Sequence, residues 1–182
     1  MNKEELGKLY PIIIVPYDLN WTSIFKNEKD IIVKILGPEI ALRVEHIGST
    51  AVPNLSAKPT IDILVEIPEE TSIKDLIINN MTRNNYIHMK EQENHLMFVK
   101  GYSPTGLEEI SFHIHMGTKE QDFLWERMYF RDYLRKNLSV ANEYERLKIK
   151  LAQTYKQDRE AYTESKTDFI KKITNLAKEK LI

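Results

Sequence analysis

One carboxylate lies at the centre of the apolar stretch of residues 60–67 (TIDILVEI), and a small polar turn precedes the stretch. The carboxylate is Asp62, and burying such a group is costly unless it is paired, binds a metal or lies at the end of a sheet. Thirteen residues earlier stands Ser49, between Gly48 and Thr50. A glycine lets the backbone approach a ligand closely, and a following serine adds an N–H and a hydroxyl that bind phosphate. We interpret Asp62 and Ser49 as candidate catalytic residues and all three turn residues as candidate phosphate ligands. A plain turn between two strands is the alternative for Gly-Ser.

The acid that would accompany Asp62 in two-metal chemistry is missing. Metal-dependent phosphoryl transfer uses two acids at positions i and i+2 of a strand, because only alternate residues share a face. Position i+2 is Leu64. Glu66 shares the face, but four residues of strand separate it from Asp62 by roughly 13 Å. The sequence therefore predicts only one acid of such a pair.

Two histidines, His113 and His115, alternate with apolar residues in the stretch 109–116 (EISFHIHM). Alternate strand residues point the same way, and two imidazoles roughly 6–7 Å apart can chelate a metal such as zinc. We expect Asp62, His113 and His115 to be the candidate metal ligands, with Mg, Mn and Zn all open as the divalent ion. Structural hydrogen bonds or a contact with an anion are the alternatives for the two histidines. His46, just before the turn, can join either site.

Three lysines have surroundings that favour anion binding. Lys58 lies between the polar turn and the strand that carries Asp62. Lys148 and Lys166 each lie within the apolar stripe of a predicted helix. A lysine on an inward helix face either extends its ammonium group to water or points into a cleft and binds an anion. We include all three among the candidate phosphate-binding residues.

Arg131 and Arg135 stand one helical turn apart in the segment FRDYLR and can clamp an anion together. Arg131 therefore joins the candidate phosphate-binding residues, and an ion pair with Asp132 or another acid is the alternative. His88 and His95 have no comparable setting, and we expect them on the surface or in loops.

The order of predicted elements favours an α+β (α/β) fold with a helical C-terminal part. Strands are predicted at 41–47 and 60–67 and within 86–116, and residues 11–18 form a short edge strand or an extended lead-in. Helices are predicted at about 22–36, 72–82, 119–136, 139–155 and 159–180. We expect one domain over residues 1–182, with an α/β core at 1–118 and C-terminal helices at 119–182.

Composition excludes several classes of protein. The 182 residues include no cysteine, which excludes disulfides and thiolate metal sites and suits a reducing cytoplasm, where we expect the protein. We expect neither a signal peptide nor a membrane span. From residue 119 onward there are 15 Lys+Arg against 11 Asp+Glu, which leaves 11 against 16 before it. A basic tail on an acidic body can frame an anionic ligand. No nucleotide-binding glycine motif or hydrolase elbow is present, and no nucleic-acid partner is expected.

Several segments together resemble the GrpB family over about residues 12–172. They are EHIGSTAVPNLSAKPTIDILV, the FHIHM strand, FRDYLR, and the tail residues Tyr144, Lys148, Leu151, Ala152, Tyr162, Lys166, Phe169 and Ile170. The resemblance implies a nucleotidyltransferase-like fold, in which a mixed β-sheet is flanked by helices and further helices follow. In that superfamily a Gly-Ser turn precedes a strand with two acids, and a later strand carries a third.

This chain departs from the superfamily pattern at two places. Leu64 stands at the second acid, and the later strand carries His113 and His115 where an acid is expected. We therefore expect a protein that binds a nucleotide or other phosphate-bearing small molecule, with group transfer open. A sensor or interaction module that keeps the fold without catalysis is the second hypothesis, and a zinc hydrolase using the two histidines and Asp62 is the third. The sequence leaves the oligomeric state open.

Overall fold

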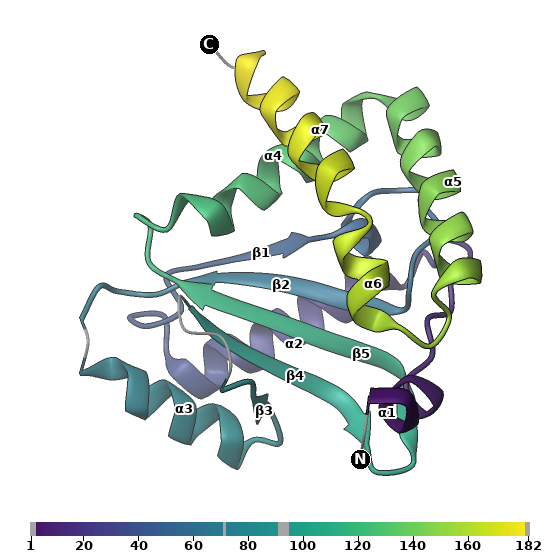
Figure 1. Cartoon of the computed structure of the whole chain (residues 1–182). Coiled ribbons are helices and arrows are strands. Elements are labelled where there is room, and N and C mark those ends of the chain that lie inside the picture. The colour runs from purple at the N-terminus through teal and green to yellow at the C-terminus, as the bar shows by residue number, and fades with distance from the viewer. Residues whose placement is uncertain (1–2, 71, 91–94, 181–182) are drawn as a thin grey trace.

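The computed structural model describes residues 3–70, 72–90 and 95–180. Five strands form one mixed sheet in the order β1-β2-β5-β4-β3 (Figure 1). The strands are β1 (Arg43–Ile47), β2 (Thr60–Glu66), β3 (Ile87–His88), β4 (Leu96–Ser103) and β5 (Gly106–Gly117). The helices are α1 (Lys3–Leu9), α2 (Trp21–Leu36), α3 (Ile73–Arg83), α4 (Asp122–Lys136), α5 (Leu138–Thr154), α6 (Arg159–Glu164) and α7 (Thr167–Glu179), with a 3₁₀ turn at Ser49–Ala51. The mixed sheet flanked by helices confirms the predicted fold class.

The central strands β2 and β5 run parallel, and their register positions the predicted site. Asp62 pairs with His113, and Leu64 pairs with His115. The other strand pairs, β1 with β2, β3 with β4 and β4 with β5, are antiparallel. Because alternate residues of a strand share a face, all four of these side chains lie on the same side of the sheet.

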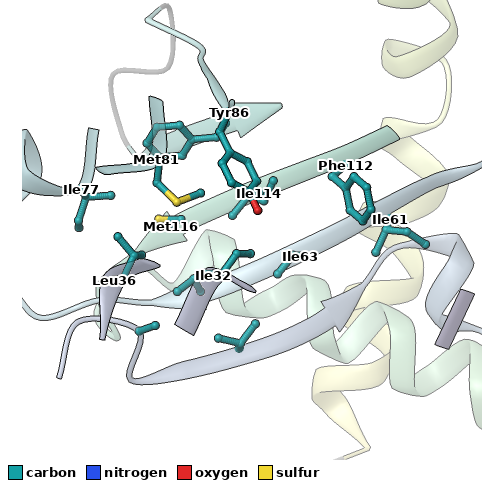
Figure 2. Packing of buried hydrophobic residues seen from close by; sticks show 14 of the residues in the cluster. Ile32, Leu36, Ile61, Ile63, Ile77, Met81, Tyr86, Phe112, Ile114 and Met116 are labelled. Atoms are coloured by element: carbon teal, nitrogen blue, oxygen red, sulfur yellow. The ribbon is translucent and has the colours of Figure 1, made fainter. Parts of the chain in front are cut away.

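The opposite face of the sheet carries the main hydrophobic core, under α2 and α3. Figure 2 shows its packed side chains: Ile61, Ile63, Phe112, Ile114 and Met116 from the sheet, and Ile32, Leu36, Ile77 and Met81 from the two helices. Fully burying one such side chain contributes about 1.5–3 kcal/mol. The alternation that faces these residues inward is what turns Asp62 and the histidines to the other side.

One charged group is buried within this core. Glu28 of α2 is 3% exposed, and its carboxylate accepts hydrogen bonds from the Tyr86 hydroxyl at 2.5 Å and from Lys100 Nζ at 2.9 Å to both oxygens. Glu28 and Lys100 thus balance each other's charge. A buried charge without its partner would cost several kcal/mol.

The helices α4 to α7 lie on the side of the sheet that carries Asp62 (Figure 1). Val52 and Leu55, which follow the polar turn, pack with Phe130, Tyr144 and Ile173 in a second apolar cluster. This cluster ties the turn to α4, α5 and α7. Within the described ranges, no helix combines the length and apolar character that crossing a membrane requires.

Two predicted elements differ from the structure, and one observed helix was not predicted. The helix predicted at 159–180 is two helices, and Lys166 is the residue that precedes the first turn of α7. Residues 11–18 contribute only one isolated bridge, between Val15 and Ala57, so the edge strand was wrong and the extended lead-in is correct. The sequence pattern also missed α1.

Candidate functional site

A cavity of about 590 Å³ lies between the sheet and the C-terminal helices. Its walls come from β2, β4 and β5, from the polar turn, and from α4, α5, α6 and α7. Six cationic side chains line it: Lys58, Arg127, Lys148, Arg159, Lys166 and Lys171. Asp62 is the one acid of the lining within the described residues, so the cavity carries a strong excess of positive charge.

Gly48 holds the polar turn against Asp62. Its φ of 73° is in the left-handed region, and a Cβ at this position would lie 2.3 Å from Asp62 Oδ2. No other residue therefore fits here without moving the carboxylate. Ser49 follows at the start of the 3₁₀ turn and lines the cavity together with Tyr144.

Thr50 and His46 lie behind the turn and not in the cavity lining. The Thr50 hydroxyl donates to the Thr60 carbonyl at 3.1 Å, and His46 Nε2 lies 3.0 Å from Thr50 Oγ1. His46 stacks on Phe25, with ring centroids 4.7 Å apart. Burial lowers the pKa of His46 to about 4, so the ring is neutral at physiological pH and donates from Nε2. Both residues stabilise the turn through these contacts, and neither lines the cavity.

Asp62 is the first member of a hydrogen-bonded chain. Its Oδ1 lies 3.4 Å from His113 Nδ1, and His113 Nε2 lies 2.7 Å from the Tyr102 hydroxyl. Arg159 Nη2 donates to the same hydroxyl at 3.0 Å, which leaves the Tyr102 proton to point at His113. Burial raises the pKa of Asp62, but the hydrogen bond and charge of His113, with His115 and Lys58, outweigh it and lower the pKa to about 2. Asp62 is therefore ionised and serves as an acceptor.

Lys58, Lys148 and Lys166 converge on one part of the cavity. The Lys166 ammonium lies 4.0 Å from the centre of the Tyr162 ring, and that of Lys58 lies 5.6 Å from the same ring. Lys148 is 2% exposed and donates to the Ser56 carbonyl. Burial, together with the charges of the neighbouring lysines, lowers the pKa of Lys148 to about 7. Burial and the Lys58 and Arg159 charges do the same for Lys166, also to about 7.

Lys58 has a smaller change. Burial and the nearby Arg159 guanidinium lower the pKa of Lys58 to about 8. Lys58 lowers the pKa of both Lys148 and Lys166, and Lys166 lowers that of Lys148, so positive charge is held here without enough negative charge to balance it.

Arg127 and Arg159 line the cavity, and the sequence reasoning missed both. Arg127 stands three residues after Leu124 and three before Phe130, both buried, so it lies on the inward face of α4. Its place in the apolar stripe of α4 is the feature of the sequence that could have identified Arg127 as a cavity residue. Arg159 begins α6, and nothing in its spacing pointed to the cavity.

Arg131 lies outside the cavity lining, and its guanidinium is already occupied. It donates to Glu45 Oε2 and to the His46 carbonyl, each at 2.9 Å, and pairs with Asp132 at 2.7 Å. Arg135 donates to the Ala51 carbonyl at 2.7 Å and 2.9 Å. The anion clamp expected from these two arginines is therefore not formed, because an acid of β1 and backbone carbonyls take up their donors.

His115 lines the cavity and contacts a histidine that was expected on the surface. His95 Nε2 lies 3.0 Å from His115 Nδ1, and the His95 ring also packs edge-on against Phe123. Burial lowers the pKa of His115 well below its ordinary value, and the nearby Arg127 charge adds to the effect. His95 lies in the bend that precedes β4, as a loop residue, and its half-buried ring packs behind His115 of the cavity lining.

The residues at this site do not fit the two-metal centre that the fold would suggest. Leu64, at the position of the second acid, is fully buried and packs with Ile47 and Leu124 under α4. Among the described residues, no group of three or more His, Asp or Glu side chains is arranged to hold a metal ion. Asp62 and His113 satisfy each other instead.

Known proteins match this chain over most of its length. The family model described as GrpB protein matches residues 11–176. Glutamate-rich protein GrpB of Alkalihalophilus pseudofirmus is 33% identical over 168 residues, which are 90% of this chain and 94% of that protein. UPF0157 protein YqkA of Bacillus subtilis is 32% identical over 173 residues, which are 93% of this chain and 49% of that protein. The chain thus spans about half the length of YqkA.

Solved structures agree with the sequence matches. The crystal structure of conserved protein GrpB from Enterococcus faecalis has a TM-score of 0.81 at 34% identity, covering 93% of this chain and 99% of that one. A structure of the Cid1 poly(U) polymerase has a TM-score of 0.54 at 10% identity, covering 84% and 49% of the two chains. The second likeness supports the nucleotidyltransferase-like fold and nothing beyond the fold. By its sequence and its structure, this chain belongs to the GrpB family.

Proposed function

We propose that the cavity binds a small molecule that carries phosphate groups, such as a nucleotide. One observation carries the proposal. Lys58, Arg127 and Lys166 line the same cavity, and within residues 3–70, 72–90 and 95–180 none of their three cationic groups donates a hydrogen bond or forms an ion pair. Gathering these unpaired positive charges in the cavity costs free energy of folding. A ligand that supplies negative charge would offset this cost.

The lysines are the phosphate-binding part of this proposal. A bound phosphate stabilises the protonated form of each nearby ammonium group, which offsets the burial and repulsion that lower their pKa values. Ser49 and Gly48 also line the cavity, where the serine hydroxyl and the closely approaching backbone contact the ligand. Asp62 then faces an uncharged part of the ligand, since it repels phosphate.

Leu64 supports a second candidate function, which is binding without chemical transfer. A buried apolar cluster occupies the place where two-metal nucleotidyl transfer needs its second acid. A sensor or interaction module needs only the cavity. If the protein does transfer a group, the cavity's cations would act by positioning the ligand and stabilising developing negative charge, with Asp62 and His113 as the groups able to hold a proton.

The test is a thermal-shift titration of the whole chain with inorganic pyrophosphate and with ATP, in a buffer without phosphate or sulfate. A ligand at a hundred times its Kd stabilises a protein by about 2.7 kcal/mol, which raises Tm by roughly 5–10 °C in a chain of this size. We expect this shift for the wild type and for Lys172→Gln, an exposed lysine of α7 outside the cavity. Lys166→Gln should lose most of it. Equal shifts for both variants, or none for the wild type, would overturn the proposal.

ATP incubated with the protein distinguishes the two candidate functions. Turnover of ATP that disappears in Asp62→Asn and His113→Gln would support group transfer. Binding without turnover, retained in both variants, would support the sensor or interaction module.

A further inference from the structure

Five of the six cations that line the cavity form two separate groups. Lys58, Lys148, Arg159 and Lys166 make up the first, which we call the lysine end. Each lysine of this group feels the charge of at least one other member. Arg127 is the second, the arginine end, and it affects the pKa of His115 and His95 instead. The charge of Asp62 reaches both ends.

The strand register shows how far apart the two ends lie. Lys58 lies two residues before Thr60, which is the first residue of β2 and lines the cavity. At the other end His115 pairs with Leu64 on one side and with Met97 on the other. Thr60 and Leu64 are four residues apart, which is roughly 13 Å along a strand. In Figure 1, α6 lies over the starting ends of β2 and β5, whereas α4 begins near the ends where these strands finish.

Asp62 lies between the two ends, halfway along this stretch of β2. Its side chain is 29% exposed, and its Oδ1 lies 3.4 Å from His113 Nδ1. A fixed negative charge at this place disfavours a continuous chain of phosphates across the cavity. It favours a ligand segment with hydroxyl groups, because a carboxylate accepts hydrogen bonds from them.

Among the described residues, no hydrogen bond or ion pair gives Arg127 a structural role. Its guanidinium makes no hydrogen bond or ion pair in the part of the chain that the structure describes, whereas Arg131, one turn further along α4, is fully used by Glu45 and Asp132. An arginine presents a planar fork of donors that matches an oxyanion. An unused fork in a cavity wall is an anion-binding group.

We propose that the ligand carries two anionic groups on the order of 10 Å apart, one held by the lysine end and one by Arg127, joined by an uncharged, hydroxyl-bearing segment against Asp62. A polyol or sugar bisphosphate has this chemistry. The inference rests on the proposed function, because it assumes that the lysine end binds phosphate, and it narrows the class of ligand.

The experiment compares fructose 1,6-bisphosphate with fructose 6-phosphate by calorimetric titration of the whole chain. We expect the bisphosphate to bind at least tenfold more tightly. Arg127→Gln should reduce this ratio to within about twofold and leave the monophosphate affinity almost unchanged, whereas Lys166→Gln should weaken both ligands. Arg127→Lys keeps a cation at the arginine end and should retain part of the ratio, which separates loss of charge from loss of fold.

The outcomes distinguish this inference from the proposed function. Equal affinities for the two sugar phosphates, or a ratio that Arg127→Gln leaves intact, would overturn the two-ended ligand while the phosphate site stands. Failure of both sugar phosphates together with pyrophosphate and ATP would overturn the phosphate site itself. Binding of ATP with neither sugar phosphate would show that the second end accepts an uncharged group, which also contradicts the inference.

Discussion

Replacing Lys166 with methionine should make the protein more stable and less able to bind anions. In the folded protein the pKa of Lys166 falls from its ordinary 10.5 to about 7, because of burial and the charges of Lys58 and Arg159. Each tenfold change in acidity corresponds to about 1.4 kcal/mol, so keeping the ammonium charged near neutral pH costs at most about 5 kcal/mol. Water in the cavity and relaxation of the chain reduce that ceiling. We expect Lys166→Met to raise the free energy of unfolding by about 1–2 kcal/mol at about pH 6.5.

The stability advantage of Lys166→Met should also depend on pH, which tests the same reasoning a second time. Between about pH 7 and pH 10.5 the unfolded chain keeps the Lys166 proton and the folded protein does not. The unfolded state then binds more protons, so the wild type becomes more stable as pH rises through this window. The advantage of Lys166→Met should therefore shrink by half or more at about pH 9.

Urea unfolding at the two pH values measures both effects, in a buffer free of phosphate and sulfate. Lys172→Met is the matched control, since Lys172 is exposed on the same helix, and it should change stability by no more than about 0.5 kcal/mol. A Lys166→Met protein that is less stable than the wild type at the lower pH would refute the reasoning. So would an advantage that does not depend on pH.

Two further predictions concern the frame of the site and the core. Gly48→Ala should lower the free energy of unfolding by about 2–3 kcal/mol and weaken anion binding, because its Cβ would lie 2.3 Å from Asp62 Oδ2. Gly106→Ala is the control, since the φ of Gly106 is also positive, at 138°, but a Cβ there has room. If urea unfolding shows that the control loses as much stability, the explanation is contradicted. Lys100→Met should lower the free energy of unfolding by about 3 kcal/mol, because it leaves the buried Glu28 carboxylate without its ion-pair partner. Adding Glu28→Gln to this variant should restore part of that free energy in urea unfolding. If the double variant is no more stable than Lys100→Met, a charge effect is contradicted.

The part of the site that could be predicted from the sequence is the part fixed by local periodicity. Alternate residues of a strand share a face, and the structure places Asp62 of β2 and His113 of β5 on one face and pairs them at 3.4 Å. Lys148 and Lys166 stood out because a lysine in an apolar stripe must either reach water or enter a cleft, and both line the cavity. These inferences need only the geometry of one element.

What the sequence could not decide depended on contacts between distant segments. Arg127 and Arg131 are four residues apart on one helix, so periodicity treats them alike. Arg131 is taken up by Glu45 of β1, and Arg127 is left to the cavity. Likewise, no glycine or proline marks the end of α6, and the apolar residues keep helical spacing across it. The sequence therefore predicted one helix and missed the break between α6 and α7, where Lys166 lies.

The most direct test of the account is whether the cavity takes up protons when it binds phosphate. Titration calorimetry of ATP into the whole chain at about pH 8, in two buffers that differ in ionisation enthalpy, measures this number, because the phosphate groups of ATP are already ionised there. Lys148 and Lys166, each with a pKa of about 7, are mostly neutral before binding and charged afterwards. We predict an uptake of about one to two protons per ATP, reduced in Lys166→Gln. No binding, or binding without proton uptake, would contradict the claim that these lysines hold the phosphates.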